Sequence, residues 1–190
     1  MTNQLGGLAK KATYIEQRRR EADGTLIVDG GDMLTPAAPR AVPGIVTPED
    51  IALRAAALVR MQSHIGLNAM AVGERALALG LKELRKLVKT HRLRLLSANL
   101  VDARGKLAFE AGFVTEVAGV KVGLFGLTEV PEAQRAPITE AGLKTTPAQD
   151  AARTEVERLR QQGAAVVIAL AHVGIQPARD LMNKVPGIDL

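Results

Sequence analysis

Two aspartates on a glycine turn are the first residues whose types and spacing suggest chemistry. Asp29 and Asp32 flank Gly30-Gly31 and follow the apolar run 25–28, which we interpret as a short buried strand. In an open α/β sheet, ligands bind at the carboxyl ends of the strands. Two carboxylates on a turn that glycine allows to be tight suit a hard or borderline cation. The alternative is that Asp29 caps the turn and Asp32 is a solvated loop acid.

Further polar residues follow the other predicted strands. They are Glu74-Arg75 after a strand at 68–72, Asn99 after one at 93–98, Thr128-Glu129 after one at 120–127 and His172 after one at 164–171. We expect them to gather at one edge of the sheet. Oxygen and imidazole ligands suit Zn, Mn, Fe or Mg, and the absence of cysteine excludes thiolate sites and disulfides. The alternative for His172 is a structural histidine whose hydrogen bonds are satisfied within the fold.

The elements that must position these residues alternate between helix and strand. The apolar spacing predicts helices at 5–22, 48–62 with Thr47 as N-cap, 77–90, 147–161 and 177–183. A turn is expected at 101–105, followed by a hairpin that joins strands at 107–117 and 120–127. The nearly continuous apolar run 164–171 predicts a central strand. The segment 30–47, with Pro36, Pro39 and Pro43, predicts a long functional or mobile loop. The segment 185–190 predicts the beginning of another strand. This alternation is typical of a layered α/β fold with a mixed sheet in one domain.

Composition limits the function classes. The chain has 190 residues, of which 47% are hydrophobic and 2% aromatic, so we expect one domain with an aliphatic core. The net charge is +5, and its densest cluster, Arg18-Arg19-Arg20, complements a helix C-terminus. Because no aromatic residues interleave with this cluster, we expect no nucleic-acid partner. No stretch approaches the roughly 20 apolar residues of a membrane span, and the first residues hold no signal peptide.

Seven segments read as motifs in a fixed order. They are 6–12, the turn Asp29-Gly30-Gly31-Asp32, the strand 68–73, Ser97-Ala98-Asn99-Leu100, the strand 120–128, the segment 169–174 with its histidine, and 185–190. Together they resemble the 5′-nucleotidase/UDP-sugar hydrolase branch of the calcineurin-like metallophosphoesterases over nearly the whole chain. In that family 68–73 would lead into a G-N-H-E motif and 185–190 into a G-H-x-H motif.

The resemblance implies an αββα sandwich of mixed β-sheets flanked by helices. It also implies two divalent metal ions (Mn, Zn, Fe or Mg) about 3.5–4 Å apart, which clamp a phosphate ester and activate a bridging hydroxide. Asp32, Glu74 and His172 fall on positions of metal ligands. Arg75 replaces a histidine; it cannot serve as an acid at neutral pH, but it is able to stabilise phosphate charge. Asn99 falls near the site, either as a structural residue or as a substrate contact.

The departures from the family pattern are equally specific. The G-N-H-E position reads Gly73-Glu74-Arg75-Ala76, so that a carboxylate replaces the asparagine ligand and an outer carboxylate is missing. Alternatively, Glu74 and Arg75 form a plain surface ion pair. The D-x-H and G-H-x-H motifs are absent from the chain. We therefore expect residues 1–190 to be a single metallophosphoesterase-like domain, a fragment without its first strand and C-terminal metal motif, or else a reduced homologue.

Two functions follow from the resemblance. The first is metal-dependent hydrolysis of small phosphate esters, such as nucleotides or nucleotide sugars, with base recognition by a further C-terminal domain. The second is a catalytically impaired homologue that serves as a binding or structural domain. By resemblance the protein would be periplasmic or otherwise exported.

Overall fold

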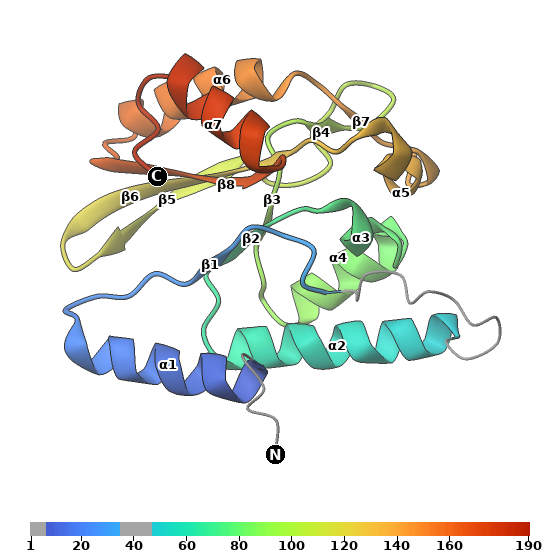
Figure 1. Ribbon diagram of the computed structural model, residues 1–190, viewed down its shortest axis with the longest axis horizontal. Coiled ribbons are helices and arrows are strands. Elements are labelled where there is room, and N and C mark those ends of the chain that lie inside the picture. The colour runs from blue at the N-terminus through green and yellow to red at the C-terminus, as the bar shows by residue number, and fades with distance from the viewer. Residues whose placement is uncertain (1–6, 35–46) are drawn as a thin grey trace.

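The computed structural model describes residues 7–34 and 47–190, whose strands form two three-stranded sheets and one short pair (Figure 1). The first sheet has the order β1-β2-β3 and is parallel: β1 is Val28–Asp29, β2 Ala69–Ala71 and β3 Leu95–Leu96. The second has the order β5-β6-β8, where β5 (Gly112–Val117) is antiparallel and β8 (Val166–His172) parallel to β6 (Val120–Thr128). The short pair joins β4 (Leu100–Val101) to β7 (Lys144–Thr145).

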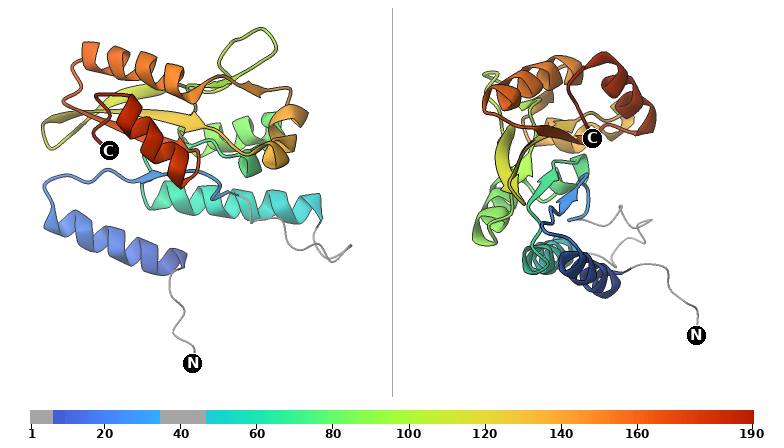
Figure 2. Two further views of the ribbon diagram at one scale, coloured as in Figure 1. Left: turned by 45° about the horizontal axis from the view of Figure 1, so that its top comes forward. Right: turned by 90° about the vertical axis from the view of Figure 1, so that its left-hand side faces the viewer.

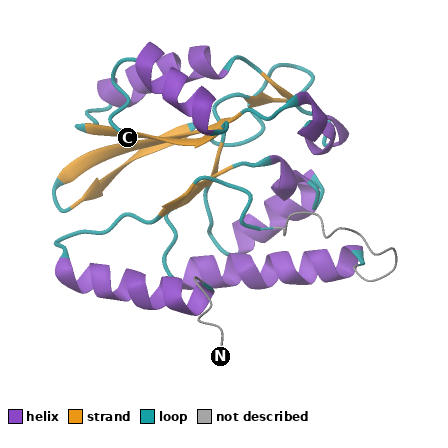
Figure 3. Cartoon of the chain, viewed as in Figure 1, coloured by secondary structure: helices purple, strands orange, loops and turns teal. Residues whose placement is uncertain are grey.

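Helices cover the outer face of each sheet (Figure 3). Beneath the first sheet lie α1 (Leu8–Glu21), α2 (Pro48–His64) and α4 (Leu81–Thr90). Over the second lie α6 (Ala148–Gln161) and α7 (Ile175–Lys184), and both views in Figure 2 show α6 on the opposite side of the sheets from α1 and α2. Short helices complete the chain: α3 (Glu74–Leu77), η1 (Glu132–Gln134) and α5 (Ala136–Glu140). The predicted αββα sandwich of mixed sheets is confirmed.

The two sheets pack together through a buried cluster of alanine and leucine side chains, and one glycine allows a close backbone approach. Ala69, Ala71 and Leu96 of the first sheet share one buried cluster with residues of the second. A Cβ on Gly126 would collide with the carbonyl group of Leu96, so only glycine permits this spacing. The core above and below is aliphatic, as the composition predicts, with Phe125 as its fully buried aromatic residue. None of the helices that the structure describes has the length and apolar character to cross a membrane.

The predicted helices form, with two corrections. At α2, Thr47 is the N-cap and exchanges capping-box hydrogen bonds with Asp50, as its sequence predicts. The predicted helix 77–90 is instead two helices, because Gly80 has φ 77° and ends the helical path between α3 and α4. α7 is longer than predicted. Leu5, Gly6 and the three prolines of the predicted loop lie outside the described residues.

The short strands depart most from prediction. β1 covers only the end of the predicted strand and includes Asp29. β4 overlaps the predicted turn 101–105 at Val101 alone, and the turn itself forms after it, where Gly105 N donates to Asp102 O (3.0 Å). β5 begins at Gly112, later than predicted, and β7 was not predicted at all. The hairpin is confirmed, and β8 forms close to its predicted place, but it is not the central strand: β6 lies between β5 and β8. β8 pairs with β6 at one edge, and at its other edge Asp189 N donates to Val167 O (2.9 Å), a strand-like contact although 185–190 form no strand.

Candidate metal centre

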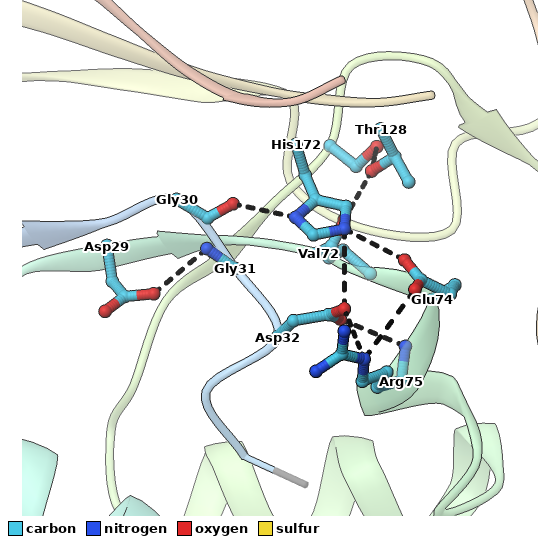
Figure 4. Close-up of polar contacts among 10 residues, drawn as sticks. Asp29, Gly30, Gly31, Asp32, Val72, Glu74, Arg75, Thr128 and His172 are labelled. Carbon is cyan, nitrogen blue, oxygen red and sulfur yellow. Dashed lines mark hydrogen bonds and ion pairs between the residues drawn. The ribbon is translucent and has the colours of Figure 1, made fainter. Parts of the chain in front are cut away.

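Three side chains from separate segments converge at the carboxyl ends of the parallel strands (Figure 4). Asp32 lies on the loop after β1, Glu74 is the first residue of α3 after β2, and His172 ends β8. His172 Nε2 lies 2.9 Å from Glu74 Oε2 and 3.5 Å from Asp32 Oδ2, and one donor atom of each residue lies within 4.8 Å of the others. The structure thus brings together the three residues that the sequence proposes as ligands.

The glycine turn explains how Asp32 reaches this position. Asp29 Oδ1 accepts a hydrogen bond from Gly31 N (3.0 Å), and both Gly31 (φ 106°) and Asp32 (φ 64°) adopt left-handed backbone conformations. The Asp32 carboxylate then fits against Gly73, where a Cβ would collide with it. Asp29 points away, 3.7 Å from Lys11 Nζ, so the turn-cap interpretation holds for Asp29. The alternative for Asp32, a solvated loop acid, does not hold, because its side chain is only 10% exposed.

The hydrogen bonds of His172 fix which nitrogen faces the carboxylates. Nδ1 lies 3.1 Å from the carbonyl oxygen of Gly30, which can only accept, so Nδ1 carries a proton. Nε2 therefore points at Asp32 and Glu74, two further acceptors. Such an arrangement is favourable when a proton or a metal cation lies between Nε2 and the carboxylate oxygens. Two carboxylates and one oriented imidazole fit a divalent cation of the Zn, Mn, Fe or Mg kind.

Arg75 belongs to the same cluster. Its backbone N donates to Asp32 Oδ1 (3.0 Å), and its Nε lies 3.2 Å from Asp32 Oδ2 and 3.9 Å from Glu74 Oε1. The Arg75 side chain is 45% exposed, whereas Glu74 is buried. The pair is therefore not the surface ion pair that the sequence left open.

Burial dominates the electrostatics of Asp32. Burial raises the pKa of the Asp32 carboxyl above its ordinary value, against the attraction of His172. The nearby charge of Glu74 raises this pKa further, while the backbone N–H and the guanidinium of Arg75 act to lower it. A bound divalent cation would offset the cost of burying these two carboxylates.

A buried polar network lies directly behind the three donors. Thr128, which pairs in register with His172, donates from Oγ1 to Val72 O (2.6 Å) and contacts Ser97 Oγ (3.0 Å). It therefore ties the second sheet to the strand that precedes Glu74. Sequence reasoning placed Thr128 at a strand end but missed this link, because nothing in the residue pattern indicates which sheets face each other.

Asn99 has a structural position in this network. Its side chain is fully buried, and its amide donates to the carbonyl oxygens of Thr128 (2.8 Å) and Thr146 (3.0 Å). Its Oδ1 accepts from the backbone N of Thr128 (2.8 Å). Both amide protons are used inside the fold, which favours the structural alternative for Asn99 over a substrate contact.

Comparisons with known proteins agree with this architecture. No protein-family model matches the chain. A 5′-nucleotidase of Vibrio cholerae is 31% identical over 181 residues, which are 90% of this chain and 31% of the relative. Two solved structures superpose well. The calcineurin-like phosphoesterase YfkN from Bacillus subtilis has a TM-score of 0.77 and is 22% identical, and the match covers 96% of this chain and 61% of YfkN. A 5′-nucleotidase precursor from Thermus thermophilus has a TM-score of 0.76 and is 23% identical, and the match covers 97% of this chain and 35% of the precursor.

The structural similarity defines the class of protein at the level of its fold, which is that of the calcineurin-like phosphoesterases. Within that class, the resemblance to the 5′-nucleotidase branch of the metallophosphoesterase superfamily is confirmed by the relatives in sequence and structure. The chain spans about 30% of the length of the curated relatives it matches.

Proposed function

We propose that this chain forms the metal-binding part of a phosphate-ester hydrolase of the 5′-nucleotidase kind. The observation that carries the proposal is the convergence of Asp32, Glu74 and His172, with Nε2 of the imidazole aimed at both carboxylates. The names of the relatives, which are 5′-nucleotidases and phosphoesterases, support the same class of reaction.

Each residue of the cluster has a distinct role in this proposal. Asp32, Glu74 and His172 would hold a divalent cation, which when bound supplies Lewis-acid activation of a phosphate ester and of water. Gly30 O keeps His172 in the tautomer that a metal ligand needs. Arg75, partly exposed beside the carboxylates, is placed to bind a phosphate oxygen and stabilise its developing charge.

The substrate and the wider protein belong to the proposal as well. A nucleoside 5′-phosphate or nucleotide sugar is the proposed substrate, since the curated relatives are 5′-nucleotidases. A further C-terminal substrate domain is proposed because the chain matches only 31% of the Vibrio relative. Residues 1–190 would then be one metallophosphoesterase-like domain of an exported protein.

One observation favours the second candidate function, a homologue with impaired catalysis that acts as a binding or structural domain. Arg75 already contacts both oxygens of Asp32, through its backbone N and its Nε. An ion pair of this kind satisfies the buried carboxylate without any metal. The two candidates therefore differ in whether the purified protein binds metal and hydrolyses phosphate esters.

The experiment compares the full-length protein with His172→Ala, and with His64→Ala as the matched control because His64 is exposed at the end of α2. We expect wild type and the control to bind Mn²⁺ and to hydrolyse p-nitrophenyl phosphate and AMP. We expect His172→Ala to lose at least about a hundredfold in Mn²⁺ affinity, since a direct ligand matters more than the outer-shell groups that cost 10–100-fold. Absence of both metal binding and hydrolysis in wild type would favour the impaired homologue.

A further inference from the structure

Lys11 of α1 lies against the glycine turn that carries Asp32. Its ammonium group lies 3.7 Å from Asp29 Oδ2 and 3.8 Å from Met33 Sδ, so it contacts the chain on both sides of Asp32. It also donates to Gln62 Oε1 on α2 (3.3 Å), and Gln62 Nε2 contacts Met33 Sδ as well. The Lys11 side chain is only 30% exposed, and Gln62 is fully buried. One polar cluster, largely shielded from solvent, therefore joins α1 and α2 to the turn.

We propose that Lys11 is a positioning residue for the metal ligand Asp32, that it acts through Asp29, and that Gln62 holds its ammonium group in place. The inference rests on the proposed function, because it takes Asp32 to be a metal ligand. It extends the support of the site from the strand ends to two helices beneath the first sheet.

The two oxygens of the Asp29 carboxylate have separate partners. Oδ1 accepts the hydrogen bond from Gly31 N (3.0 Å, Figure 4), and Oδ2 faces Lys11 Nζ. Because the Asp29 side chain is only 15% exposed, water does not readily replace a lost cation. Without the ammonium group, we expect the carboxylate to rotate towards solvent and to release Gly31 N. The bond that closes the turn therefore depends on the ion pair behind it.

The backbone of the turn makes this support necessary. Gly31 (φ 106°) and Asp32 (φ 64°) both have left-handed conformations, and a residue with a side chain rarely adopts one unless its surroundings hold it there. On the side of the site, Arg75 N donates to Asp32 Oδ1. That bond fixes the carboxylate itself, whereas Lys11 and Asp29 fix the backbone that presents it.

The first test needs no metal. Hydrogen exchange of the metal-free, full-length protein is measured by mass spectrometry on peptides that cover 27–34. Lys11→Met keeps most of the apolar stem and removes the charge, and we expect its turn to exchange at least about threefold faster than that of wild type. Peptides of β6 should exchange as in wild type, which shows that the fold is intact. Lys82→Met, on the exposed side of α4, is the matched control and should match wild type throughout.

Two results of this test would overturn the inference. The first is unchanged exchange at 27–34 in Lys11→Met, which would mean that the ammonium group does not hold the turn. The second is faster exchange in every peptide, β6 included, which would mean that Lys11 stabilises the whole fold rather than the turn.

The second test measures Mn²⁺ affinity by calorimetry. We expect Lys11→Met to bind about tenfold more weakly than wild type, at the low end of the range for outer-shell groups. Lys11→Arg keeps the positive charge and should stay within about threefold of wild type. Asp29→Ala should weaken binding too, and adding Lys11→Met to it should cost little more, because both residues act along one path.

The outcomes separate this inference from the proposed function. If wild type binds Mn²⁺ and Lys11→Met binds it equally well, the inference is overturned and the proposed function stands. Losses that add in the double variant would also overturn it, since Lys11 would then not act through Asp29. If wild type binds no Mn²⁺, the proposed function fails and the inference fails with it.

Discussion

At the scale of single residues, one backbone carbonyl and one loop conformation decide the chemistry of the cluster. Gly30 O holds Nδ1 of His172, and the left-handed backbone at Asp32 (φ 64°) turns its carboxylate towards Nε2. A non-glycine residue in this conformation is uncommon and costs free energy, on the order of 1 kcal/mol or more. The fold compensates with the hydrogen bond that Arg75 N donates to Asp32 Oδ1.

The raised pKa of Asp32 yields a prediction about stability and pH. Because the folded state raises this pKa above the ordinary 3.8, chiefly by burial, the metal-free protein loses stability as the pH rises through the folded value. Asp32→Asn, which is neutral at every pH, should make the metal-free protein more stable than wild type at pH 7. The difference should shrink as the pH falls through the folded value and then below the ordinary value of 3.8, where wild type is protonated in both states.

Urea unfolding of both proteins in a chelator, at several pH values, measures this difference. With saturating Mn²⁺ the order should reverse, since wild type then gains stability by binding the cation and Asp32→Asn does not. A variant less stable than wild type in chelator at pH 7 would show that the Arg75 and His172 contacts outweigh the burial of Asp32.

At the scale of elements, the link between the two sheets is the feature that positions the ligands. Thr128 at the end of β6 donates to Val72 O, immediately before the Gly73-Glu74 turn. Its neighbour in register, His172, ends β8. One hydroxyl therefore connects β6, the partner of the strand that carries the imidazole ligand, to the strand that leads to the carboxylate ligand.

Removing that hydroxyl should weaken both stability and metal binding. Thr128→Val keeps the shape of the side chain but leaves buried polar groups unpaired, at a cost of about 1–3 kcal/mol in the free energy of unfolding. Thr128→Ser retains the hydroxyl and should lose less. Urea unfolding and Mn²⁺ titration of the full-length variants check both effects. Equal stability of Thr128→Val and wild type would mean that the hydroxyl does not link the sheets energetically.

The elements also show which features the sequence determines locally. α6, β6 and β8 have strong apolar patterns and form close to where they are predicted. β4 and β7 are two residues each, too short to carry a periodic pattern, and they exist only because distant segments pair. The break between α3 and α4 at Gly80 was missed because the apolar spacing continues through it.

The candidate site likewise combines features that the sequence predicts with features that only the structure shows. Asp32, Glu74 and His172 were identified by the order of motifs and by their places after strands. The contact between Arg75 and Asp32 depends on a loop conformation, and the role of Thr128 depends on how the two sheets pack. Neither is encoded in a local pattern, so only the three-dimensional structure reveals them.

At the scale of the whole molecule, the sandwich serves to bring separate strand ends to one place. The first sheet supplies the loops that carry Asp32 and Glu74, and the second supplies His172 at the end of β8. The sheets pack through alanine and leucine side chains, and Gly126 allows a close backbone approach, so donors far apart in sequence meet within 4.8 Å. The proposed metal binding and hydrolase activity depend on this convergence of the three donors.

A crystal structure of the full-length protein grown with Mn²⁺ tests that central claim most directly, through the anomalous scattering of manganese. We expect a peak bonded to His172 Nε2 and to carboxylate oxygens of Asp32 and Glu74 at roughly 2.0–2.2 Å. A structure at saturating Mn²⁺ in which no peak touches these three residues would contradict the account.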